Sequence, residues 1–144
     1  MHALHPTQQA ILRLARPLTA PLILLLAGLL RFYQLSGQSL WADEGNSVAL
    51  ARRGLVEIAR RTAFDIHPPL YYWLLKLWLS VFGDSEIGLR SLSVLLGIGL
   101  VYLTWLLGMR FFSSRVGLTA AFIAALSPLQ LYYSQEARMY MLLA

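Results

Sequence analysis

Hydrophobic residues occur along this chain in long uncharged runs, separated by segments that hold most of the charges. A membrane-spanning helix needs about 20 predominantly apolar residues. We predict three such helices, over about residues 17–36, 91–109 and 116–134. The third contains Pro128, which is expected to kink the helix and free a backbone carbonyl that neighbouring groups must satisfy.

The first predicted span must extend past Arg31 to reach the required length. We interpret Arg31 as a snorkelling cation near one membrane face, next to the interfacial aromatic residues Phe32 and Tyr33. A secretory signal peptide is the competing interpretation. It is disfavoured because no Ala-x-Ala-like cleavage site follows the apolar core.

The segment between the first two spans, about residues 37–90, has the pattern of interfacial helices. Residues 47–62 place apolar and charged residues on opposite faces at helical spacing, which predicts an amphipathic helix; a solvated helix packed on its neighbours is the alternative. Residues 68–82 are too short to span and contain Lys76, so we predict a second interfacial helix that begins at Pro68 and Pro69. The expected fold is an all-α integral membrane module over residues 1–144, with three transmembrane and two interfacial amphipathic helices.

This topology separates the charges of the chain. The N-terminus and residues 110–115 share one membrane face, on which all the charged side chains are basic (Arg13, Arg16, Arg110 and Arg115). Residues 37–90 and 135–140 share the other face, which holds all seven acidic residues. The distribution agrees with the positive-inside tendency. Asp43 and Glu136 are therefore expected on the same side of the membrane.

Composition supports membrane insertion. Hydrophobic residues make up 58% of the chain and charged residues 13%, and the mean hydropathy is +0.59, values typical of integral membrane proteins. The absence of cysteine excludes disulfides, thiolate catalysis and cysteine-ligated zinc. The net charge of +5 is spread over the loops, which indicates that these charges set the membrane topology and contact lipid headgroups. The sequence shows no nucleic-acid-binding module, and a nucleic acid is not expected as a partner.

Several motifs occur in a fixed order on the predicted outer face. They are Trp-Ala-Asp-Glu-Gly at residues 41–45, His-Pro-Pro-Leu-Tyr-Tyr at 67–72, Phe-Gly-Asp-Ser-Glu at 82–86 with Leu-Arg at 89–90, and Tyr-Tyr-Ser-Gln-Glu-Ala-Arg-Met-Tyr at 132–140. With the apolar run that precedes them, the motifs resemble the N-terminal part of the GT-C superfamily of membrane glycosyltransferases, near its protein O-mannosyltransferase and aminoarabinose-transferase branch. The resemblance covers nearly the whole chain.

The resemblance implies a set of roles for individual residues. Members of the superfamily use lipid-linked sugars, usually polyprenyl-monophosphate donors, and an acidic residue in the first outer loop activates the acceptor. Asp43 matches that residue, and Glu44 completes the Asp-Glu pair, so both are catalytic candidates. The substrate-binding candidates are the residues that match the motifs near the donor phosphate and in the second loop: His67, Glu136, Arg138 and Tyr140. Members are also longer, which implies that the remainder of a longer chain is a partner of this one.

The chemistry of these residues suits glycosyl transfer. The reaction needs a base near the acceptor hydroxyl, which Asp43 can supply. It also needs cations near the phosphate, which Arg138 and His67 can supply. We expect the N-terminal portion of a glycosyltransferase that moves a mannose-like or aminoarabinose-like sugar from a polyprenyl-phosphate donor to a hydroxyl. We expect it in the bacterial inner membrane, in contact with membrane lipids, with its active site facing outward. A divalent cation held by Asp43, Glu44 and His67 is an open alternative that the spacing does not require.

Simpler interpretations of the same residues remain open. Asp43 and Glu44 could cap the helix that follows them, His67 could be a turn residue, and Glu136 with Arg138 could form a structural ion pair. The whole chain could be a non-catalytic membrane subunit or a truncated remnant that binds lipid or a partner. A transporter fragment is disfavoured because the acidic residues lie outside the predicted spans.

Overall fold

The computed structural model describes residues 6–64 and 67–144, with side chains described from residue 18 onward. All regular secondary structure in these ranges is helical, as predicted, and no strand occurs in them. The helices are α1 (Pro6–Phe32), α2 (Ala42–Ala51), α3 (Leu55–Ala63), α4 (Pro69–Phe82), α5 (Glu86–Phe111), α6 (Ser114–Leu126), α7 (Pro128–Ser134) and α8 (Tyr140–Leu143).

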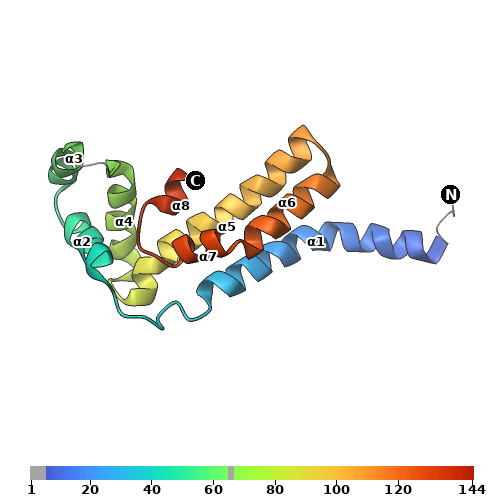
Figure 1. Cartoon of the computed structure of the whole chain (residues 1–144), viewed down its shortest axis with the longest axis horizontal. Coiled ribbons are helices and arrows are strands. Elements are labelled where there is room, and N and C mark those ends of the chain that lie inside the picture. The colour runs from blue at the N-terminus through green and yellow to red at the C-terminus, as the bar shows by residue number, and fades with distance from the viewer. Residues whose placement is uncertain (1–5, 65–66) are drawn as a thin grey trace.

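Helix α5 lies at the centre of the arrangement and contacts α1, α4, α6, α7 and α8. Figure 1 shows α5 and α6 as an antiparallel hairpin beside α1, with α2, α3 and α4 gathered at one end. The N-terminal end of α1 and the turn between α5 and α6 lie toward the opposite end (Figure 1). The arrangement separates the two sets of loops in the way the predicted topology requires.

The predicted spans are reproduced in part. Helix α5 contains residues 91–109 and is the one described helix that is long and apolar enough to cross a membrane. Helices α6 and α7 pass the same criteria only together, and they are bent by 60° at their junction. Helix α1 ends at Phe32 rather than residue 36, and its described apolar part, Leu18–Phe32, is shorter than a span. Crossing by α1 and by the bent pair stays a prediction.

The amphipathic helix predicted over residues 47–62 is two helices, so the outer segment holds three helices rather than two. Helix α2 ends at Ala51, and Gly54 is the N-cap of α3, where its carbonyl accepts the first hydrogen bond from Ile58, 2.9 Å away. Glycine is a poor helix former, because it loses more backbone freedom than other residues on ordering. The break therefore falls at the residue least suited to continue the helix.

Arg31 is not a snorkelling cation, because its side chain is fully buried. Its guanidinium donates to the carbonyls of Ala124 and Ala125 over 3.4 and 3.2 Å and to the hydroxyl of Ser134 over 3.1 Å. Pro128 has no N–H with which to continue the helix, so the carbonyl of Ala124 loses its usual i+4 donor. The kink predicted at Pro128 is thus confirmed, and Arg31 satisfies the carbonyls that the kink releases.

Gly97 on α5 leaves the room that this cluster needs. A Cβ atom at this position would overlap the hydroxyl of Ser134 and lie 3.0 Å from Nε of Arg31. Any larger residue would have to displace side chains that are themselves buried and hydrogen-bonded. Sequence alone gave no reason to connect Gly97 with Arg31.

We predict that Arg31→Met lowers the free energy of unfolding by at least about 2 kcal/mol, since it leaves buried carbonyls without donors. Leu29→Met, an exposed position on the same helix, is the matched control and should change stability little. Thermal unfolding of both variants in the same detergent measures the difference. Equal melting temperatures would contradict the role given to Arg31.

Candidate functional site

A buried ion pair joins Glu44 on α2 to Arg90 near the start of α5. The two side chains meet in a bidentate arrangement, with Nε and Nη2 of Arg90 donating to Oε1 and Oε2 of Glu44 over 2.9 and 2.7 Å. The side chain of Glu44 is fully buried and that of Arg90 nearly so. Planar guanidinium and carboxylate groups in this geometry form one of the stronger polar contacts in proteins.

The same pair holds two further segments in place. Nη1 of Arg90 donates to the carbonyls of Leu35 and Gln38, each over 2.8 Å. Oε1 of Glu44 accepts a hydrogen bond of 3.0 Å from the backbone N–H of Ala137. The loop before α2, the start of α5 and the segment after α7 are therefore fixed to one another through two side chains.

Burial raises the pKa of the Glu44 carboxyl, but the hydrogen bonds from Arg90 and Ala137 and the positive charge of Arg90 outweigh it. The resulting pKa of Glu44 lies below its ordinary value. Glu44 is therefore ionised at neutral pH, as its pairing with Arg90 requires.

Asp43, the neighbour of Glu44, belongs to a second and more accessible cluster. Nη1 of Arg138 forms an ion pair with Oδ2 of Asp43, and Nη2 of Arg138 lies 3.4 Å from Nε2 of His67. The guanidinium also stacks over the ring of Tyr140, 5.1 Å from its centroid. The Asp43 side chain is 50% exposed and that of Arg138 18%, so this cluster combines a solvent-accessible carboxylate with a partly buried cation.

The Asp43 cluster thus brings together four of the six site residues expected from the sequence, from segments far apart in the chain. A fifth, Glu44, lies in the buried pair with Arg90. The sixth, Glu136, is buried but does not join the Asp43 cluster: Arg138 pairs with Asp43 and not with Glu136. The structural ion pair considered between Glu136 and Arg138 is not formed. Asp43 and Glu44 lie in the first turn of α2, but neither caps it, since Trp41 is the N-cap residue.

Glu136 instead lines a cavity of about 220 Å³ that Arg90 also lines. Its side chain is more than nine-tenths buried, and Oε1 accepts no hydrogen bond from the described residues. The cavity is lined by residues from the loop between α1 and α2, from α5, from α7 and from the segment after α7: Gln34, Leu35, Gln38, Trp41, Arg90, Tyr132, Gln135 and Glu136.

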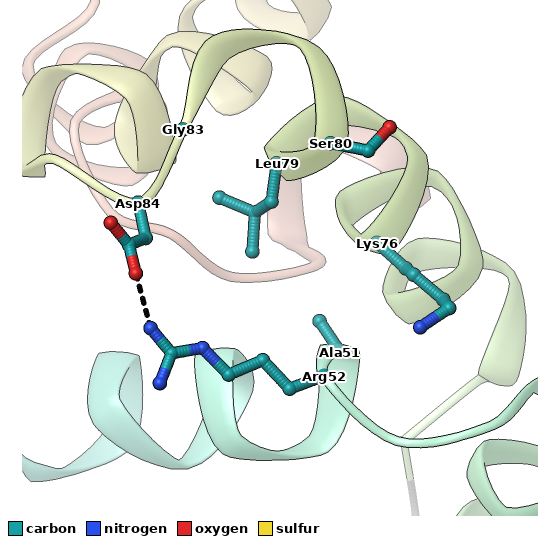
Figure 2. A pocket seen from close by; sticks show the side chains of 7 residues that line it. All are labelled: Ala51, Arg52, Lys76, Leu79, Ser80, Gly83 and Asp84. Carbon is teal, nitrogen blue, oxygen red and sulfur yellow. Dashed lines mark hydrogen bonds and ion pairs between the residues drawn. The ribbon is translucent and has the colours of Figure 1, made fainter.

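A different hollow, of about 420 Å³, lies between α2 and α4 and contains another Asp–Arg pair. Figure 2 shows Arg52 paired with Asp84 across it, with Lys76 on the α4 side. The side chains of Arg52 and Asp84 are 64% and 61% exposed, so solvent screens their attraction and the pair contributes little to stability. We do not assign chemistry to this hollow, and its Asp–Arg pair is a suitable control for the pair formed by Asp43 and Arg138.

The residues considered for a divalent cation do not converge in the structure. Glu44 faces Arg90, and Arg138 contacts both Asp43 and His67. No group of three or more acidic or histidine side chains placed to hold a metal ion occurs in the part of the chain that the structure describes.

Arg90 is the main site residue that the sequence did not identify. In the sequence Arg90 belongs to the Leu-Arg motif and directly precedes the predicted span over residues 91–109, without an assigned role. An arginine at the start of an apolar helix can lie at the membrane boundary facing lipid, or it can form a buried ion pair. Its position in the sequence does not distinguish these two environments. Trp41, Tyr132 and Gln135, which line the Glu136 cavity, were likewise present in the motifs without an assigned role.

The chain is similar to a known protein family and to a protein of another organism. The family model described as dolichyl-phosphate-mannose-protein mannosyltransferase matches residues 66–144. A protein of Aquifex aeolicus (strain VF5), described as an uncharacterized protein, is 30% identical over 101 residues, which are 65% of this chain and 20% of that protein. The chain therefore spans about a fifth of the length of this relative. No solved structure matches the chain.

We predict that Glu44→Gln destabilises the protein by about 3–5 kcal/mol at neutral pH, because Arg90 is left buried without a counter-charge. The pKa of Glu44 in the folded chain is lower than its ordinary value of 4.5. Its contribution is therefore complete above the unfolded-state pKa and is lost as the pH falls through the folded-state pKa. Melting temperatures measured from pH 7 downward should converge for wild type and Glu44→Gln.

Glu57→Gln provides the control for this experiment. Glu57 also pairs with an arginine, Arg61, but both side chains are substantially exposed, so solvent screens the pair and the melting temperature should change little. A Glu44→Gln protein as stable as Glu57→Gln at neutral pH would contradict the importance given to the buried pair.

Proposed function

The chain belongs to the dolichyl-phosphate-mannose-protein mannosyltransferase family, and we propose that it is the N-terminal portion of a membrane glycosyltransferase. The proposed donor is a polyprenyl-phosphate sugar, mannose-like or aminoarabinose-like, and the proposed acceptor is a hydroxyl group. Asp43 is the proposed base. The observation that carries the proposal is the cluster of Asp43, Arg138 and His67, which provides a carboxylate next to cationic and imidazole groups.

The proposed reaction forms one bond and breaks one bond at the anomeric carbon. The acceptor oxygen attacks this carbon while its proton passes to the carboxylate of Asp43. The bond between the anomeric carbon and the phosphate oxygen breaks, and polyprenyl phosphate leaves with the electron pair. A base near the attacking oxygen and a cation near the departing phosphate each stabilise charge that develops in the transition state.

Exposure distinguishes the roles of the two adjacent carboxylates. Asp43 is half exposed and can meet an acceptor hydroxyl, whereas Glu44 is fully buried and occupied by Arg90 and Ala137. Both were catalytic candidates. In the proposal Asp43 contacts the substrate, and Glu44 is a positioning residue that holds the backbone on either side of the cluster.

The donor phosphate is placed at Arg138 and His67. A guanidinium can bind phosphate oxygens through two parallel hydrogen bonds, and Arg138 is oriented by its contacts with Asp43 and the Tyr140 ring. Binding of the phosphate at Nη2 and at Nε2 of His67 would leave Asp43 free for the acceptor. Tyr140 and Glu136 remain proposed substrate-binding residues.

We also propose the membrane placement that this chemistry needs. With α1, α5 and the bent pair α6–α7 as three crossings, the cluster lies at the outer face of a bacterial inner membrane. A lipid-anchored donor can reach a site at the membrane interface without leaving the bilayer. Helices α3 and α4 would then lie in the interface, where the exposed Phe64, Trp73 and Leu77 contact lipid.

Asp43→Asn in the complete enzyme is predicted to lower kcat by about 10²–10⁴-fold, the usual contribution of a general base. The matched control is Asp84→Asn, because Asp84 is also a carboxylate paired with an arginine but lies at the other hollow (Figure 2). The measurement is transfer from a polyprenyl-phosphate sugar to an acceptor. Wild-type activity in Asp43→Asn would overturn the assignment of the base.

Arg138→Gln is predicted to raise KM for the donor by about 10- to 100-fold, which corresponds to the loss of a charged hydrogen bond. Arg138→Lys should recover part of this loss, because it keeps the charge without the planar geometry. Arg52→Gln is the control, since Arg52 pairs with Asp84 at the other hollow. An unchanged KM for the donor in Arg138→Gln would exclude Arg138 from phosphate binding.

A further inference from the structure

We infer that the cavity next to Glu136 binds the ring of a monosaccharide through its hydroxyl groups. This inference rests on the proposed function in one respect, since the ring would belong to the donor or to a glycosylated acceptor. The cavity itself is defined by observations that do not depend on the reaction.

The first observation is the state of the Glu136 carboxyl. The residue is only 7% exposed, and Oε1 accepts no hydrogen bond from any residue that the structure describes. Burying a polar atom without a partner is costly, so such an atom is satisfied by water or by a ligand. A ligand hydroxyl that replaces water at Oε1 preserves this hydrogen bond.

The second observation is the character of the walls. Gln34 and Gln38 carry amides that can both donate and accept hydrogen bonds. Gln135 is fixed at one end, because its Nε2 donates to the carbonyls of Arg31 and Tyr33 over 3.2 and 2.9 Å. Several convergent polar groups on a rigid wall are the usual means of orienting a small polar ligand.

Aromatic side chains complete the cavity. Trp41 and Tyr132 line it together with the polar groups, and both are partly accessible to solvent. An indole presents a flat apolar face, and a phenol adds a hydroxyl at its edge. A sugar ring has the matching character, with apolar C–H faces and hydroxyl groups around its rim.

Size and charge narrow the class of ligand. The volume of about 220 Å³ corresponds to roughly seven water molecules and is smaller than the roughly 300–1,000 Å³ of pockets for drug-sized ligands. Arg90 is neutralised by Glu44, so the carboxylate of Glu136 leaves the cavity with a net negative charge. A phosphate is therefore disfavoured here, whereas a neutral ring with hydroxyl donors fits.

The cavity also adjoins the catalytic cluster along the chain. Trp41 lies two positions before Asp43, and Glu136 lies two positions before Arg138. Arg90 lines the cavity and binds Glu44. A ring bound at Glu136 and a phosphate bound at Arg138 would therefore occupy neighbouring parts of one site.

The test is binding of neutral methyl glycosides to the complete protein in detergent, followed by saturation-transfer NMR. Wild type should give a saturation signal that Glu136→Ala and Trp41→Ala reduce by at least about five-fold, the equivalent of one hydrogen bond or ring contact. Glu136→Gln and Trp41→Phe keep an acceptor and an aromatic face, so they should retain most of the signal. Phe64→Ala, at an exposed aromatic residue outside the cavity, is the control, and melting temperatures verify that each variant folds.

Two results would overturn the inference. One is a glycoside signal that is unchanged in Glu136→Ala and Trp41→Ala. The other is the absence of a saturation signal from every neutral glycoside tested. Binding of an amine-bearing glycoside alone counts as this second result, because recognition would then depend on charge pairing and not on the hydroxyl groups. Either result can occur while transfer activity remains, so it would leave the proposed function intact.

Failure of the proposed function gives a different result. In that case Asp43→Asn would keep transfer activity or no transfer would be found, while the glycoside signal could still depend on Glu136 and Trp41. Competition experiments identify the source of the ring. If the sugar-bearing polyprenyl phosphate displaces the methyl glycoside and polyprenyl phosphate alone does not, the ring belongs to the donor. Displacement only by a glycosylated acceptor assigns it to the acceptor.

Discussion

The ion pair between Glu44 and Arg90 is the interaction on which the arrangement of α2, the start of α5 and the segment after α7 depends. Removing both charges from water costs several kcal/mol per ion, and the attraction between them offsets that cost only when the remaining hydrogen-bonding positions are also filled. Here they are filled by backbone groups of two segments, at Leu35 and Gln38 in the loop before α2 and at Ala137 after α7. The pair therefore cannot form unless these segments are in place, and their positions determine where Asp43 and Arg138 meet.

Two adjacent carboxylates have different environments because of helix geometry. Side chains at i and i+1 point in different directions, about 100° apart around the axis. When the first turn of α2 directs Glu44 inward to Arg90, Asp43 is necessarily directed elsewhere, and it remains half exposed beside Arg138. An Asp-Glu pair at this position thus provides one buried anchor and one accessible carboxylate, which a single acidic residue could not do.

The sequence was sufficient for some features and insufficient for others, for physical reasons. Long apolar runs and Pro128 predicted the helices and the kink, since both depend on local chemistry. The topology and the motifs predicted Asp43, His67 and Arg138 on one membrane face, and in the structure Arg138 contacts the other two. The burial of Arg31 and Arg90 was not predictable, because an arginine at the end of an apolar run satisfies the same pattern whether it faces lipid or carbonyls. The break at Gly54 was missed because the helical spacing continues across it.

The two buried arginines act on the same segment from opposite ends. Arg31 binds the carbonyls freed at the start of α7 and the hydroxyl of Ser134 at its last residue. Arg90 acts through Glu44, which holds the N–H of Ala137 only three residues later. Helix α7 is short, so its direction is fixed by these contacts at its two ends more than by its own hydrogen bonds. The 60° bend at Ser127 would otherwise leave the position of Arg138 undetermined. The proline-induced kink and the Asp43 cluster are therefore connected, because the segment that Arg31 and Glu44 hold at its two ends leads directly to Arg138, the partner of Asp43.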